Sequence, residues 1–244
     1  MRKLLGYLAS ILVILLFWQL AALLIDSPAL PTPLATFPML VRYASQLAPD
    51  FLISLYRVLV AMAIGTVLAM PLGLAIGRSP RLDTLFAPLL YILYPIPKIV
   101  LLPVLLVLLG LADAPKIVLI ALTIFFQVSV TVRDAAKAVP EGAVLSIRSL
   151  GASRLDVFTH VVVPASLPEL FTALRISSGT AVAILFFAEA IAGSTGLGYF
   201  IVDSWAMINY PRMFAGIIAM ALLGVVLYEA FDVLERRLTR WRMV

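Results

Sequence analysis

Residues 52–77 read LISLYRVLVAMAIGTVLAMPLGLAIG, a run of 26 residues in which Arg57 is the one charged side chain. A helix that crosses a bilayer needs about 20 mostly apolar residues, so this run predicts a membrane-spanning helix. Small residues recur at every fourth position of the run, namely Ala61, Gly65, Ala69, Gly73 and Gly77. Because such a stripe allows close backbone approach, we expect this helix to pack tightly against a neighbouring helix.

The composition of the whole chain agrees with a membrane protein. Of its 244 residues, 63% are hydrophobic and 13% are charged, and the mean hydropathy is +1.11. Further apolar runs lie at about 4–25, 85–110, 115–132, 174–193 and 213–233. Long unbroken apolar runs satisfy their backbone groups in lipid as helices. The sequence therefore predicts an all-α polytopic membrane protein with about six transmembrane helices, the first of them retained because it is too long for a signal peptide.

Basic residues predict the orientation of these helices. The net charge of +5 reflects Lys and Arg at the ends of apolar runs, which indicates membrane topology and no nucleic-acid partner. Thirteen basic residues lie on the same side of the membrane as the termini: Arg2, Lys3, Arg78, Arg81, Arg133, Lys137, Arg148, Arg154, Arg175, Arg236, Arg237, Arg240 and Arg242. Four basic residues lie on the other side: Arg42, Arg57, Lys116 and Arg212. We expect both termini and the loop at 133–173 in the cytoplasm of a bacterial or archaeal inner membrane.

The chain is expected to form one transmembrane domain. Residues 1–51 would supply a leading helix and an external segment, and residues 52–233 a five-helix core. A loop helix is expected at 141–158 and a cytoplasmic tail at 234–244.

The third apolar run and the fifth contain the candidate residues inside the membrane. Prolines interrupt the run at 85–110 around Tyr94 and Lys98. Its first part is expected to be interfacial or kinked, and Lys98 either faces a polar cavity or extends to the headgroups. Glu189, toward the end of the run at 174–193, is a candidate gate or interface residue.

Residues 141–158 have the character of a soluble helix. Val144, Ile147, Leu150, Leu155 and Phe158 follow helical spacing, and Gly151 either breaks the helix or caps its end. An amphipathic cytosolic helix of this kind either lies on lipid headgroups or docks into the groove of a partner.

Two short motifs in this loop resemble the EAA loop of ABC importer permeases. They are SLGAS at 149–153 and VVVP at 161–164, in which Gly151, Val161, Val163 and Pro164 match the family pattern at its spacing. The Glu-Ala-Ala of that pattern is replaced by Leu-Ser-Ile at 145–147.

Three longer stretches extend the resemblance to the permeases of nitrate, sulfonate and taurine importers. They are YPIPKIVLLPVLLVLLGL at 94–111, SLGASRLDVFTHVVVPASLPEL at 149–170 and AEAIAGSTGLGYFI at 188–201. The resemblance implies a type I importer permease, paired with a second copy as a homodimer, whose loop is the coupling helix. It implies coupling residues Ser149, Leu150, Gly151, Ala152, Ser153, Arg154 and Pro164. Tyr94, Lys98 and Glu189 are the candidates for the translocation path or gate.

The chain is expected to be a transport subunit and not an enzyme. It has no G-x-x-x-x-G-K-[ST] phosphate loop, so ATP and Mg²⁺ are expected on a cytosolic ATPase dimer and no cofactor or metal in this chain. With one histidine, His160, and no cysteine, no catalytic cluster is evident. The other expected partners are an extracytoplasmic solute-binding protein and membrane lipid.

The substrate expected from the resemblance is a small organic or inorganic anion, such as a sulfonate, taurine or nitrate. Importers of riboflavin or a thiamine precursor are the alternative. From the physics alone, an ion-coupled secondary transporter remains a rival, because broken helices and buried charges occur there too.

Overall fold

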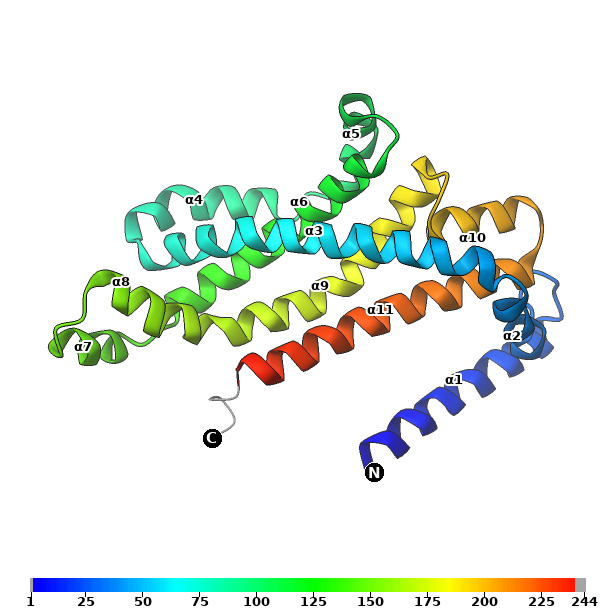
Figure 1. Ribbon diagram of the computed structural model, residues 1–244, viewed down its shortest axis with the longest axis horizontal. Helices are drawn as coiled ribbons and strands as arrows, with labels where there is room; N and C mark the ends of the chain where they lie inside the picture. Colours follow the sequence, from blue (N-terminus) through cyan, green and yellow to red (C-terminus); the bar gives the residue numbers. More distant parts are fainter. Residues whose placement is uncertain (1, 240–244) are drawn as a thin grey trace. The chain divides into compact units, whose positions relative to one another are not determined.

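The computed structural model describes residues 2–239, which form helices and connecting turns with no strand among them (Figure 1). Residues 1 and 240–244 lie outside the described part, and with them Arg240, Arg242 and the last residues of the expected tail. The all-α prediction is confirmed.

The chain divides into two compact units. The first comprises Met1–Ser54 and Glu189–Leu222, and the second comprises Leu55–Ala188 and Leu223–Val244. Helices α3 (Ala44–Arg78), α9 (Val163–Ala192) and α11 (Tyr210–Leu238) contribute residues to both units.

Helix α6 (Asp113–Lys137) forms the centre of the second unit. Its residues Ile120, Ile124, Val128 and Val132 are fully buried, because apolar side chains recur at helical spacing along one face. The small-residue stripe of α3 lies against this helix. A methyl group built on Gly65 would come within 2.7 Å of the backbone oxygen of Ala121, too close for any side chain.

The same close approach recurs further along α3. A methyl group on Gly73 would meet the Ser129 oxygen at 2.9 Å, and one on Gly77 would clash with the Arg133 oxygen. The predicted packing role of the stripe is therefore confirmed.

The third expected span is not one helix. Helix α4 (Pro80–Leu93) ends before Pro95, and a 3-10 turn (Lys98–Leu101) continues into α5 (Leu102–Leu109) at an angle of 81° to α4. Pro95 and Pro97 lack the N–H groups that would continue α4, and proline restricts the residue before it to extended conformations. The expectation of a kink within 85–110 is thus confirmed, and the expected span corresponds to this bent pair of helices.

The other expected spans correspond to long apolar helices. Four helical stretches are long and apolar enough to cross a membrane by themselves, and the bent pair makes a fifth candidate. Helix α1 (Arg2–Ile25) covers the first expected span, with a shorter apolar portion at Ala9–Ile25. At 35 residues, α3 is about 52 Å long and exceeds a bilayer.

Two helices of the first unit were not expected. Helix α2 (Pro33–Arg42) begins at an N-cap, Thr32, whose side chain accepts from the Ala35 N–H. Helix α10 (Leu197–Ala206) follows the glycine-rich turn after α9. Both are about 10 residues long, too short for a span, so the search for runs of 20 apolar residues could not find them.

Candidate functional site

The loop at 141–158 consists of two short helices separated by Gly151. Helix α7 (Glu141–Ser149) follows α6 directly, and α8 (Arg154–Val157) passes through a π-helical turn (Phe158–Val162) into α9. Gly151 has φ +89°, in the left-handed region that favours glycine. Its N–H donates to the Arg148 oxygen and the Ala152 N–H to the Ile147 oxygen, which is a Schellman C-cap. Gly151 therefore both breaks the helix and caps the end of α7.

Helix α8 begins with a capping box. The Ser153 hydroxyl accepts from the Asp156 N–H at 3.2 Å, and the Asp156 carboxylate accepts from the Ser153 N–H at 2.8 Å. Hydrogen bonds from the side chain and then the backbone of Ser153 hold the pKa of Asp156 below its usual value. Asp156 therefore stays ionised at neutral pH and favours the helical N-terminus.

The apolar side chains of this loop do not all face the protein. Val144 and Val157 are buried, whereas Leu150, one of the predicted apolar-face residues, is 87% exposed. Leu145 and Leu155 are exposed as well. The predicted amphipathic helix, glycine break and second helical turn are present, and Leu150 and Leu155 of the predicted apolar face are exposed in this chain. Figure 1 shows α7 and α8 at the opposite end of α6 from α5.

The remaining expected coupling residues lie around the same turn. Ser149 ends α7 and Arg154 begins α8, both exposed, while Ala152 is partly buried. Pro164 is the second residue of α9, directly after the π-helical turn at Phe158–Val162. The structure thus brings these residues together except for Pro164, which follows one short helix later.

The break in the third span encloses a pocket of about 300 Å³ in the second unit. Tyr94 and Lys98 both line it, together with residues of α6 and α9. Lys98 is 7% exposed, and its ammonium donates to the backbone oxygens of Leu93 and, at 2.9 Å, of Tyr94. It lies 4.6 Å from the centre of the Phe126 ring. Lys98 thus satisfies the free carbonyl groups at the end of α4 and lines the pocket.

Glu189 belongs to the first unit, so it does not share the Lys98 pocket. Its side chain is fully buried and accepts from the Ser54 hydroxyl at 2.9 Å and from the Gly198 N–H at 2.9 Å. A methyl group on Gly196 would clash with its carboxylate. Glu189 therefore fixes the turn that leads into α10.

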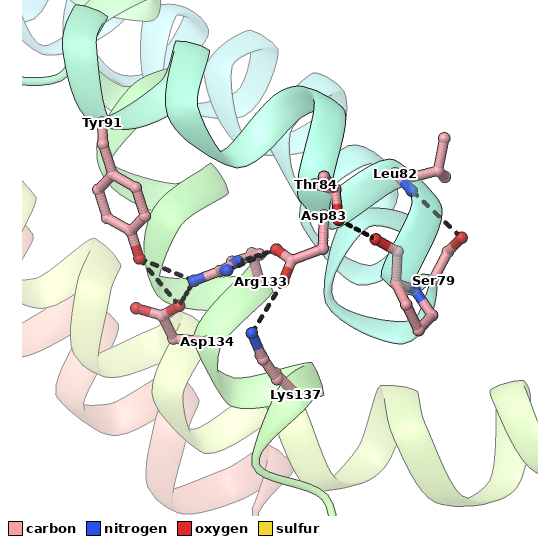
Figure 2. Close-up of polar contacts among 9 residues, drawn as sticks. Ser79, Leu82, Asp83, Thr84, Tyr91, Arg133, Asp134 and Lys137 are labelled. Carbon is pink, nitrogen blue, oxygen red and sulfur yellow. Dashed lines mark hydrogen bonds and ion pairs between the residues drawn. The ribbon is translucent and has the colours of Figure 1, made fainter.

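Sequence reasoning missed an ionic cluster between α4 and α6. Figure 2 shows Arg133 between Asp83 and Asp134, with 2.5 Å and 2.6 Å between the charged atoms. Arg133 also donates to the Tyr91 hydroxyl at 2.7 Å, and Lys137 pairs with Asp83 at 2.8 Å. The i, i+4 spacing of Arg133 and Lys137 was a signal that the two share one face, but no pattern identified Asp83, 50 residues away, as their partner.

The start of α6 carries a second ion pair, between a buried arginine and a half-exposed aspartate. Arg57 of α3, whose side chain is 3% exposed, pairs with Asp113 at 2.6 Å. The ammonium of Lys116, which is also buried, donates to the oxygens of Leu111 and Ala112. Charged groups therefore gather at both ends of α6, and the residues between Lys116 and Arg133 carry no charge.

Known proteins are similar to this chain in sequence and in fold. Residues 65–240 match the family described as binding-protein-dependent transport system inner membrane component. The taurine transport system permease protein TauC of Escherichia coli (strain K12) is 32% identical, over 97% of this chain and 88% of that protein. The putative aliphatic sulfonates transport permease protein SsuC of Bacillus subtilis (strain 168) is 30% identical, over 99% of this chain and 90% of that protein.

Solved structures agree on the fold. The inward-facing MetNI methionine ABC transporter contains a chain that superimposes with a TM-score of 0.68 at 20% identity, over 81% of this chain and 98% of that chain. At this identity the likeness concerns the fold alone, which is that of ABC importer permeases.

These matches decide between the classes that the composition left open. They cover more than half of the chain, so an ion-coupled secondary transporter and a membrane enzyme are excluded. The apolar helices belong to a multi-pass membrane protein that works with a separate ATPase and a binding protein. The chain belongs to the family of binding-protein-dependent transport system inner membrane components, and it is a permease subunit of an ABC importer.

Proposed function

We propose that this permease imports a small organic or inorganic solute with an anionic group, with taurine and other sulfonates as the first candidates and nitrate as a further one. The observation that carries the proposal is the similarity to TauC over 97% of the chain. The cationic pocket at Lys98 supports it, because a buried ammonium favours an anionic ligand.

Import of a vitamin or its precursor, such as riboflavin or a thiamine precursor, is the second candidate. The formylaminopyrimidine transport permease protein ThiX of Halalkalibacterium halodurans is 28% identical over 95% of this chain. The identity is lower than for TauC and SsuC, and a neutral pyrimidine gives no role to the charge of Lys98.

The proposed orientation places both termini and the loop at 133–173 in the cytoplasm of a bacterial or archaeal inner membrane. The excess of basic residues on that side supports it. The cluster around Arg133 and the pair of Arg57 with Asp113 would then lie near opposite faces of the lipid bilayer, at the two ends of α6.

We further propose that the loop from Ser149 to Arg154 couples the permease to a dimer of the ATPase. ATP and Mg²⁺ would be held by that partner, with no cofactor in this chain, and a second copy of the permease would complete a homodimer. The exposed leucines Leu145, Leu150 and Leu155 support a partner groove, because three apolar side chains on a polar loop are costly in water.

Two of the buried charged residues, Lys98 and Glu189, receive different proposed roles. Tyr94 and Lys98 would line the translocation path. Glu189 would act at the outer gate, by holding the turn from which α10 begins. The binding protein would meet the permease on that outer side.

The test is uptake by proteoliposomes that contain the permease, its ATPase and its binding protein. We expect ATP-dependent uptake of ³⁵S-taurine or an alkanesulfonate, abolished when the ATPase carries a hydrolysis-deficient substitution. Formylaminopyrimidine and riboflavin serve as the competing substrates. Uptake of either one with no uptake of a sulfonate or of nitrate would overturn the proposed substrate class.

A further inference from the structure

The pocket at the break in the third span combines one buried charge with several neutral polar groups. Lys98 supplies the charge, and the polar groups are the side chains of Tyr94, Thr123, Gln127 and Thr180. Among the described residues that line it, none is acidic. The pocket therefore carries a net positive charge in a part of the protein where an uncompensated charge is costly.

The lysine is only partly satisfied by the protein. An ammonium has three N–H donors, and the backbone oxygens of Leu93 and Tyr94 take up two of them. Both acceptors are neutral, so they solvate the charge without cancelling it. The Phe126 ring, 4.6 Å away, contributes a cation–π contact, which likewise leaves the charge in place.

Gln127 adds an independent sign of a missing ligand. Its side-chain oxygen is buried and has no hydrogen-bond partner among residues 2–239. Buried polar atoms are nearly always paired, so an unpaired amide at the wall of a pocket needs an explanation. Because an amide can turn over to present either its oxygen or its N–H₂ group, Gln127 is able to meet a ligand as donor or acceptor.

A neighbouring pocket shows that this polarity is not a general property of the bundle. Between α3 and α6 lies a cavity of about 380 Å³ whose lining is entirely apolar and includes Ile64, Leu68 and Phe125. That cavity suits lipid tails or a helix, whereas the one at Lys98 suits an acid. The volume at Lys98, about 300 Å³, equals that of about ten water molecules, which fits a compact solute.

We propose that this pocket is a binding site for a small organic acid on its way through the permease. The sulfonate or carboxylate group would lie on the Lys98 ammonium and accept from Gln127 or Thr180, and the short apolar part would contact Phe126. The proposal rests on the proposed function and deepens it, because it assigns substrate recognition to the permease as well as to the binding protein.

The experiment measures equilibrium binding of ³⁵S-taurine to the permease–ATPase complex in nanodiscs without the binding protein. We expect saturable binding that propane-1-sulfonate displaces and propylammonium, its cationic counterpart, does not. Lys98→Met and Gln127→Glu should each weaken binding at least tenfold, the first by removing the charge and the second by neutralising the pocket. Lys98→Arg, which keeps the charge, should retain much of the binding.

Lys116→Met is the matched control. Lys116 is buried like Lys98 and donates to the carbonyls four and five residues before it, as Lys98 does, but it does not line the pocket. Its variant should bind taurine as the wild type does. A second pair compares Thr180→Val, which alters the pocket, with Thr131→Val, which does not. If Lys98→Met fails to assemble, Gln127→Glu and Thr180→Val decide the outcome.

Three results would overturn the proposal. They are wild-type affinity in the Lys98→Met and Gln127→Glu complexes, displacement by propylammonium, and loss of taurine binding when phosphatidylglycerol replaces phosphatidylcholine in the nanodisc. The last would identify a site for an anionic lipid headgroup. Uptake of taurine by the full transporter together with no binding here would contradict this site alone, whereas absent uptake of every sulfonate and of nitrate would contradict the proposed function.

Discussion

The Ser54 hydroxyl donates to the carboxylate of Glu189 and lies 2.9 and 3.0 Å from its two oxygens, although 135 residues separate Ser54 from Glu189 in the chain. The same hydroxyl accepts from the Leu197 N–H, and Glu189 accepts from the Gly198 N–H. Both N–H groups lie in the first turn of α10, whose N-cap position is Gly196 and has no side chain of its own. Residues of α3 and α9 thus supply the cap that the local sequence lacks.

The first prediction concerns Glu189. Replacing it by Ala leaves the Gly198 N–H and the Ser54 hydroxyl without their buried acceptor, at a cost of roughly 1–3 kcal/mol for each group. We expect a lower thermal midpoint of the purified permease and weaker uptake. Glu189→Gln, which keeps one acceptor oxygen, should lose less. The exposed Glu229 is the control, and a midpoint for Glu229→Ala as low as that for Glu189→Ala would contradict a specific role of the buried carboxylate.

The second prediction concerns the cluster in Figure 2. Arg133→Met breaks an ion pair whose side chains are 10% and 17% exposed, so we expect a destabilisation of about 3–5 kcal/mol. Lys137→Met removes a cation that is 57% exposed and should cost less than about 1 kcal/mol. Thermal unfolding in detergent compares the two variants. Equal losses of stability in the two variants would mean that burial does not determine how much each ion pair of the cluster stabilises the protein.

Much of the bundle was predictable because lipid imposes simple rules on the sequence. Runs of about 20 apolar residues located the long helices. The spacing of Gly65, Gly73 and Gly77 predicted the face that α3 packs against α6, since a side chain at any of these positions would collide with the backbone of α6. Neither inference required knowledge of a distant partner.

The remaining features depend on contacts between residues far apart in the chain. The prolines around Lys98 predicted a kink, but neither the angle of 81° nor the capping of α4 by Lys98 follows from the spacing of these prolines. Helical periodicity predicted that Leu150 and Leu155 share the apolar face of the loop, but it gave no sign of the left-handed turn at Gly151 or of how far both leucines are exposed in this chain. The partners of Glu189 and Arg133 could not be inferred, because charge complementarity leaves many pairings open.

The third prediction concerns topology. Reporter fusions after Arg81, near Glu141 and at Val244 should be cytoplasmic, and a fusion near Ala112 should be external, because thirteen basic residues stand on one side and four on the other. Alkaline phosphatase and a fluorescent protein give opposite signals and serve as paired reporters. Phosphatase activity of the fusion near Glu141 would refute both the topology and the coupling role of the loop.

The fourth prediction tests the coupling loop. Any side chain at Gly151 is strained by about 1–2 kcal/mol at φ +89°, although a methyl group there meets no atom within 4 Å. Gly151→Ala should therefore weaken uptake, and Gly151→Trp or Arg154→Glu should abolish it, while membrane abundance stays normal because the loop lies outside the bundle. Gly142→Ala, in an equally open helical position, is the control.

Crosslinks from Ser153 should capture the ATPase in the wild type and be lost with Gly151→Trp. Normal uptake by both Gly151→Trp and Arg154→Glu would show that the loop lies on lipid and that coupling runs elsewhere.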